Sequence, residues 1–271
     1  MLSRKKVYAI SIAIFACFVP AQTASLSATI FEDNTNSEYF TSSANVMNDV
    51  NSTLKNAKAE NKLALFILGA DWCHDSRAIA SRLNGPELKS LLDDKYEVLL
   101  IDVGYFTHGN DVVERFGQPT LYATPTVMII DPASGQLING HNMHQWRDAD
   151  LITTEQTINY FQTMASPDSH TQNKHKSSIP AIDKLLKDVS AFELKQAIRI
   201  KNGYQQMVPY LKMTKKERPK KFYEIWVELR DLRYALTDDT ARLRREIFER
   251  TQAGELKIKL KYPNYKAFSW E

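Results

Sequence analysis

The sequence predicts an α/β fold, with a central mixed sheet flanked by helices, followed by a C-terminal helical extension. Short apolar runs typical of buried strands alternate with helical patterns up to about residue 165, whereas only helical periodicity follows residue 180. The composition, 43% hydrophobic and 25% charged residues, supplies enough apolar side chains for a buried core. It excludes the disordered and collagen-like classes of protein.

The N-terminus has the pattern of a secretory signal peptide, which we expect over residues 1–24. Three basic residues at 4–6 precede an apolar run over 7–20, and small residues follow. The run is shorter than the roughly 20 residues of a membrane-spanning helix, which favours cleavage over a retained anchor. A lipid anchor on Cys17 is the alternative. The pattern predicts a periplasmic or secreted protein with no transmembrane anchor after processing.

The first elements are predicted in the order helix, strand, helix. Residues 43–61 carry apolar side chains at helical spacing, and residues 63–68 are a continuous apolar run that suits a strand covered on both faces. The next helix, from about residue 74 to 94, is interrupted at 84–86 because the proline there cannot donate a helical hydrogen bond. This order is the first half of an α/β unit.

A hairpin and a final helix are expected to complete this unit. Three elements come first, a buried strand, a short helix and another strand: 96–103, 110–116 and 125–130. Residues 131–135 are of the types that form turns, so residues 136–142 are expected to return antiparallel beside the preceding strand. A helix over 148–164 closes the unit.

The remaining residues predict a linker and a basic helical region. We expect a first domain over 43–165, a polar linker over 166–179 and a basic helical region over 180–271. Within this region Pro209 separates two helical segments, Gly254 ends a last one, and the tail over 257–265 has no assigned structure.

Charge divides the chain in the same way. Without the basic residues at 4–6, the first 180 residues carry a net charge of −8, and the rest carry +8. The basic helices therefore suit docking onto the acidic domain, an anionic membrane or a partner protein. No nucleic acid partner is expected for an exported protein.

The candidate chemistry centres on Cys73, which opens a helix directly after a buried strand. Unpaired N–H groups and the positive end of the helix dipole favour the thiolate there and lower the cysteine pKa. Protonated His74 adds to this effect and Asp75 opposes it. Ser76 is close enough to offer the sulfur a hydrogen bond. Because Cys17 lies in the signal peptide, no internal disulfide is expected in the mature chain.

The residues Trp72-Cys73-His74-Asp75-Ser76 resemble the W-C-x-x-C active site of thioredoxins, with serine in place of the second cysteine. Thr124-Pro125, before an apolar strand, resembles the cis-proline loop that in this fold lies against the nucleophile and binds an extended partner. An ordinary turn proline is the alternative for Pro125. The stretches 69–76, 102–104 and 115–117 are similar to a bacterial thioredoxin-like family with a W-C-H-D-S site, over about residues 43–164.

This resemblance implies a thioredoxin-like fold and a set of site residues. Cys73 is the expected nucleophile, and His74 and Ser76 are expected to tune its sulfur. Trp72, Thr124 and Pro125 are expected to contact the partner.

Two departures from the thioredoxin pattern shape the expected activity. Ser76 cannot attack a mixed disulfide on Cys73, and Ile67 stands where thioredoxins usually hold a buried carboxylate. The sequence therefore predicts a possible thiol–disulfide oxidoreductase without a resolving cysteine. It would exchange with a protein or low-molecular-weight disulfide, need an external thiol and use no cofactor. The alternative is a non-catalytic binding or scaffold module in which Cys73 is a buried structural residue.

Metal binding is the other alternative considered for the histidines. His141 and His144, with His74 or His108 and Cys73, offer ligand types that copper or zinc accept. Their spacing contains no second ligand pair at a recognised interval, so we predict no metal site.

Overall fold

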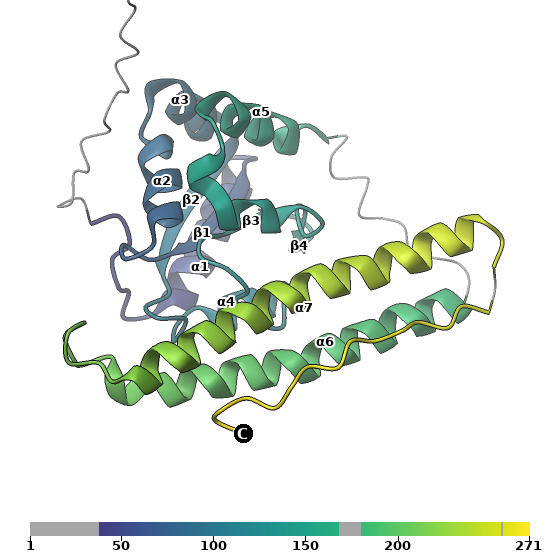
Figure 1. Cartoon of the computed structure of the whole chain (residues 1–271). Coiled ribbons are helices and arrows are strands. Elements are labelled where there is room, and N and C mark those ends of the chain that lie inside the picture. Colours follow the sequence, from purple (N-terminus) through teal and green to yellow (C-terminus); the bar gives the residue numbers. More distant parts are fainter. Residues whose placement is uncertain (1–37, 168–179, 256) are drawn as a thin grey trace, which may run out of the picture. The chain divides into compact units, whose positions relative to one another are not determined.

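The computed structural model describes residues 38–167, 180–255 and 257–271. The predicted signal peptide with Cys17, and most of the predicted linker, lie outside the described residues. The described residues belong to one compact unit (Figure 1). Within them, no helix combines the length and the apolar character needed to cross a bilayer.

A four-stranded mixed sheet in the order β2-β1-β3-β4 forms the centre of the α/β part. Strand β1 (Leu63–Gly69) pairs in parallel with β2 (Tyr96–Asp102) and antiparallel with β3 (Thr126–Asp131). Strand β4 (Gln136–Leu137) pairs antiparallel with β3. Every residue of β1 is buried, as its continuous apolar run predicts for a strand covered on both faces.

Helices cover the two faces of this sheet (Figure 1). Alternate β1 side chains point to opposite faces, so Phe66 and Leu68 belong to one apolar cluster and Leu65 and Ile67 to another. Within the α/β part, two α-helices contribute to the Phe66 cluster: α1 (Val46–Ala59) and α4 (Asn110–Arg115). Three contribute to the Ile67 cluster: α2 (His74–Leu83), α3 (Pro86–Lys95) and α5 (Thr154–Ala165).

The predicted interruption between α2 and α3 is confirmed, and its cause is local. Pro86 is the first residue of α3 and Gly85 is its N-cap. A proline fits this position because the N–H that it lacks would have no partner inside the helix.

Strand β2 differs from the expected buried strand. It pairs only with β1 and lies at the edge of the sheet, and Val98 at its middle is 37% exposed. An apolar run reports burial of side chains but not the number of neighbouring strands.

The returning strand of the hairpin is also shorter than predicted. Strand β4 ends at Leu137, and the side chain of the buried Asn139 then replaces the backbone ladder. Asn139 Oδ1 accepts from Ile129 N at 2.9 Å, and its Nδ2 donates to Val127 O at 2.9 Å. Two hydrogen bonds of a strand are thus made by one amide.

The predicted helix over 148–164 is in fact two elements. The first is the 3₁₀ helix η1 (Met143–Leu151), with non-helical φ and ψ at Asp148, and the second is α5. Thr153 starts α5 with a capping box, in which its side chain accepts from Gln156 N and the Gln156 side chain accepts from Thr153 N. This N-terminal cap is a start signal that separates the two helices.

The C-terminal residues form a long helical hairpin, as Figure 1 shows. Its arms are α6 (Pro180–Met207) and α7 (Lys220–Gln252), and the short 3₁₀ helix η4 (Val208–Tyr210) follows α6. The predicted break at Pro209 is therefore present. The last predicted helical run is the end of α7 and not a separate helix, and Gly254 with φ of 81° follows it. The predicted helical region does not reach residue 271, because the described residues 257–271 form no helix.

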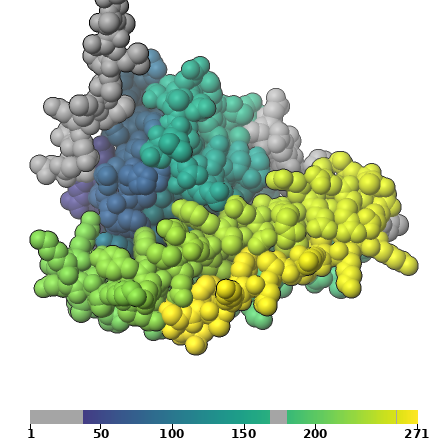
Figure 2. All heavy atoms as spheres, viewed as in Figure 1, coloured from purple at the N-terminus to yellow at the C-terminus, as the bar shows by residue number. Residues whose placement is uncertain are grey.

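This hairpin lies against the α/β part (Figure 2), and the two parts share a core. One buried cluster contains Phe66 and Val103 of the sheet region together with Tyr204 of α6 and Leu229 of α7. Lys201 of α6 also forms an ion pair with Glu114 of α4 at 2.7 Å. The domain limits 43–165 and 180–271 remain a prediction.

Candidate functional site

Cys73 occupies the N-cap of α2, directly after β1 and a short turn. Its φ and ψ of −93° and 122° are extended, and its carbonyl accepts the first helical hydrogen bond from Arg77 N at 3.1 Å. The side chain is 7% exposed. Its Sγ donates to the carbonyl of Thr124 at 3.1 Å. The thiol therefore lies at a helix N-terminus and against the loop that precedes β3.

Sheet register explains why this loop meets the cysteine. Thr126 at the start of β3 pairs with Leu68 near the end of β1. Residues just before β3 therefore lie beside the residues just after β1. The Thr124–Pro125 peptide bond in this loop is cis. The two predicted motifs, about 50 residues apart in the chain, are thereby placed together.

Ser76 supports the loop instead of the sulfur. Its side chain is fully buried, and its hydroxyl makes a hydrogen bond of 2.9 Å with the hydroxyl of Thr124. The expected bond from Ser76 to Cys73 is replaced by this contact. The residue in the place of a second cysteine therefore helps to position the residue before Pro125.

The turn before Cys73 is held by an N-terminal segment that no pattern in the sequence assigned to this place. The carboxylate of Asp71 accepts from Tyr39 N at 3.0 Å and from Phe40 N at 3.3 Å. Phe40 is buried against Gly69, where any Cβ would overlap its ring. Gly69 is thus required for a close approach at the end of β1.

His74 faces two carboxylates. Its Nε2 lies 3.2 Å from Asp75 Oδ2 and 3.5 Å from Asp150 Oδ2, and its side chain is largely exposed. Burial, helped by a hydrogen bond to the Asp150 carboxyl, raises the pKa of Asp75 to about 6. The same hydrogen bond lowers the pKa of Asp150. Any positive charge on His74 is therefore partly balanced by these two acids.

Asp150 is a site residue that sequence reasoning missed. Its backbone N–H donates to Asp75 Oδ1 at 3.1 Å, although 75 residues separate the two in the chain. It lies in η1, and no local pattern marked it. Only the packing of η1 on α2 could have revealed the contact.

The described residues contain one group with the geometry of a metal site. It consists of His74, Asp75 and Asp150, whose ligand atoms all lie within 4.8 Å of one another. Imidazole–carboxylate pairing and the shared hydrogen bond account for this arrangement. Of the histidines considered from the sequence, His74 belongs to this group, whereas His108, His141 and His144 do not.

Trp72 is held by the loop after β2 and by the C-terminal hairpin. Its Nε1 donates to Gly104 O at 2.8 Å, and its ring stacks on Tyr105 at 5.0 Å between centroids. The ring of Trp226, from α7, meets it edge-on at 5.3 Å. The expected contact residue for a partner is therefore already packed against another part of the same chain.

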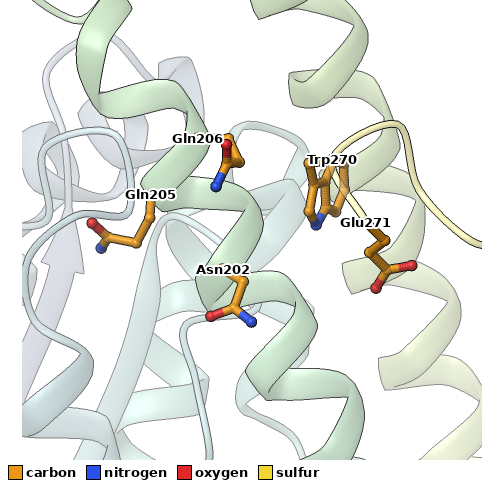
Figure 3. A pocket seen from close by; sticks show the side chains of 5 residues that line it. All are labelled: Asn202, Gln205, Gln206, Trp270 and Glu271. Carbon is orange, nitrogen blue, oxygen red and sulfur yellow. The ribbon is translucent and has the colours of Figure 1, made fainter.

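Two hollows in the described surface lie near the site and on the C-terminal region. One of about 10 Å³, room for a single water, touches Pro125 and is lined in part by His144, whose pKa burial lowers. Another of about 280 Å³ lies between α6 and the C-terminal residues (Figure 3). Its lining is three amides, an indole and a carboxylate: Asn202, Gln205, Gln206, Trp270 and Glu271. Neither includes Cys73.

Comparison with known proteins found a family model and a solved structure that match part of the chain. Residues 45–132 match a family model described as thioredoxin-like. A solved structure of a disulphide isomerase from Xylella fastidiosa Temecula1 is similar to part of the chain, with 22% identity and a TM-score of 0.45. That match covers 48% of this chain and 99% of the isomerase chain. No curated protein matches the chain. The fold and the matched residues together show that the chain carries a thioredoxin-like domain.

Proposed function

We propose that this protein performs thiol–disulfide exchange through Cys73 alone. The observation that carries the proposal is the placement of one sulfur at the N-cap of α2, 3.1 Å from the carbonyl of Thr124 in a cis-proline loop. A thiol at a helix N-terminus faces unpaired N–H groups. The thioredoxin-like domain places these features in a fold suited to disulfide chemistry.

The reaction proceeds in two balanced steps. The Cys73 thiolate attacks one sulfur of a disulfide RSSR, which forms Cys73–S–S–R and releases RS⁻. A second thiolate, R′S⁻, then attacks the R sulfur of the mixed disulfide, which regenerates the Cys73 thiolate and yields RSSR′. Ser76 cannot perform the second attack, so the resolving thiol comes from another molecule. We propose that the exchange takes place outside the cytoplasm, which the signal pattern of residues 1–24 supports.

The direct test is the formation and release of the mixed disulfide. A Cys17→Ser variant, in which Cys73 is the sole cysteine, is incubated with oxidised glutathione and followed by intact mass. We expect one glutathione adduct, which reduced glutathione removes, and none in the Cys17→Ser/Cys73→Ser control. The proposal fails if Cys73 gains an adduct only after the protein is unfolded.

The alternative is a non-catalytic module that binds a partner. The observation that favours it is the burial of Cys73, with its thiol donating to Thr124. The two functions differ in their dependence on the sulfur. A binding module keeps its partner in a Cys73→Ser variant, whereas an exchanger loses every covalent complex that non-reducing electrophoresis detects.

A further inference from the structure

The C-terminal hairpin packs on one flank of Cys73. Trp226 of α7 meets the Trp72 ring at 5.3 Å and the Tyr105 ring at 5.9 Å. Phe222, one turn earlier on α7, meets Tyr105 edge-on at 6.3 Å. Aromatic rings in such contacts exclude water and resist displacement. The side chain directly before the cysteine is thus partly covered by α7.

A second anchor lies next to the cis-proline loop. Arg233 of α7 is only 4% exposed, and its Nη1 donates to the carbonyl of Tyr122 at 2.8 Å. Its guanidinium lies 4.2 Å from the ring centre of Phe106. The hydroxyl of Tyr122 donates to Glu193 Oε1 of α6 at 2.8 Å. Side chains from both arms of the hairpin therefore bond to Tyr122, in the loop that leads into Thr124 and Pro125.

A third contact reaches η1, which also carries Asp150. Arg147 of η1 lies 5.0 Å from the ring centre of Tyr234 and 3.3 Å from Asp238 Oδ1, both on α7. Through these three contacts α7 runs from Trp72, past the cis-proline loop, to η1, whose Asp150 lies beside His74.

The hairpin is a fixed part of the molecule at these contacts. Leu229, Leu232 and Leu236 of α7 are buried in the same cluster as Phe66 of β1. Undocking α7 would expose these side chains, and each costs roughly 1.5–3 kcal/mol to transfer to water. The docked helix α7 therefore forms a fixed wall beside Cys73 and is not a mobile flap.

We infer that this wall limits Cys73 to low-molecular-weight disulfides. The inference rests on the proposed function and narrows its substrate class. Exchange requires the sulfur of Cys73 to approach a partner sulfur along the line of its S–S bond. A disulfide on a small molecule can turn to meet a side chain that is 7% exposed. A disulfide on a folded protein brings a surface with it, and that surface meets α7 first.

The test compares two disulfides with the same leaving group. One is the 2-thiopyridyl disulfide of N-acetylcysteine, and the other is the 2-thiopyridyl disulfide of a surface cysteine on a small folded carrier protein. Attack on the cysteine sulfur of either releases pyridine-2-thione, which absorbance records. The second-order rate constants are measured for the Cys17→Ser protein and for glutathione, an unhindered reference thiol.

The expected result is a carrier-to-small rate ratio lower for Cys73 than for glutathione by about tenfold or more. A smaller difference overturns the inference while leaving the proposed function intact. A Cys73 that reacts with neither disulfide, in a folded protein, removes the proposed function itself. The two failures are therefore distinguishable.

A variant pair locates the wall. Trp226→Ala removes the indole that covers Trp72, and its neighbour Val227→Ala removes a largely exposed side chain as a matched control. We expect Trp226→Ala to raise the rate with the carrier at least about threefold more than the rate with the small disulfide, and Val227→Ala to change neither. Equal effects of the two variants contradict the assignment. The wild-type ratio still decides the inference if Trp226→Ala does not fold.

Discussion

Ser76 shows how one atom separates this site from a dithiol site. Its hydroxyl makes a hydrogen bond with the hydroxyl of Thr124, and the carbonyl of the same Thr124 accepts a hydrogen bond from the Cys73 thiol. The serine therefore holds the loop in place, but a thiol from another molecule must resolve the mixed disulfide. This division of roles leads to a direct test at one position.

In a Cys17→Ser background, Ser76→Cys should convert the site into a dithiol that can form an internal disulfide. Residues 73 and 76 lie one helical turn apart, within the span that a disulfide bridges. Oxidised glutathione should then yield an internal disulfide between Cys73 and the introduced cysteine, seen as a loss of both alkylatable thiols without a persistent adduct. The matched control is Ser81→Cys, which lies about 12 Å further along α2 and should keep its glutathione. A lasting adduct in both variants contradicts the geometry.

Asp75 makes stability depend on pH. Burial and the hydrogen bond to Asp150 raise its pKa from 3.8 to about 6. Its proton is therefore held more tightly in the folded state, and the stabilisation that this gives below about pH 4 is lost as pH rises to about 6. We expect Asp75→Asn to be more stable relative to wild type at about pH 7 than at about pH 3, by about 1 kcal/mol after allowance for solvent screening.

Urea unfolding at the two pH values measures this difference. Asp94→Asn, at an exposed position, is measured in parallel as the control. A pH-independent effect of Asp75→Asn would show that the carboxyl titrates normally.

The main site positions followed from the sequence, but several of their contacts did not. Cys73 and Thr124-Pro125 stand at the end of one strand and the start of another, and strand signals are local. Asp150 and Trp226 are brought to the site by elements far away in the chain, so no local pattern marked them. Ser76 was expected to bond to the sulfur, but its hydroxyl bonds to the hydroxyl of Thr124.

At the scale of elements, strong signals led to correct predictions and weak ones did not. Strand β1 is a long apolar run, and the break before α3 is fixed by Pro86. The prediction failed at β4, where an asparagine amide replaces a strand. It also failed at η1, which helical periodicity merged with α5. Periodicity reports which side chains are buried, and it does not report which backbone groups pair.

Asn139 provides the test at this scale. Replacing its amide by a carboxylate in Asn139→Asp removes the donor to Val127 O and places two oxygens against each other. We expect a loss of about 1–3 kcal/mol in the free energy of unfolding at neutral pH. Chemical denaturation measures it, and Asn159→Asp on the exposed face of α5 is the control. Equal stabilities of the two variants would show that the amide does not hold β3.

At the scale of the whole molecule, the hairpin and the α/β part behave as one body. The unequal charge of the two parts of the sequence indicated a separate basic region. Docking of this region on the acidic domain was one of three options. The structure shows the hairpin buried against that domain, with Tyr204 stacked on Phe106 at 4.8 Å. The sequence could not predict this because the aromatic residues of α6 and α7 fit equally well in a core of their own.

A shared core predicts cooperative unfolding. Far-UV circular dichroism reports the helices, of which α6 and α7 are the longest. Tryptophan fluorescence reports Trp72 and Trp146 of the α/β part together with Trp226 and Trp270 of the C-terminal part. Because buried residues of both parts form one cluster, we expect the two signals to change at the same urea concentration. Two separate transitions would show that the hairpin folds on its own.

The most direct measurement of the central claim is turnover with Cys73 as the sole thiol. The Cys17→Ser protein is mixed with hydroxyethyl disulfide and excess reduced glutathione, and formation of oxidised glutathione is followed. We expect many turnovers per protein molecule above the uncatalysed rate, and none in the Cys17→Ser/Cys73→Ser variant. A rate equal to the uncatalysed one, in a folded protein, would contradict a working nucleophile at the start of α2.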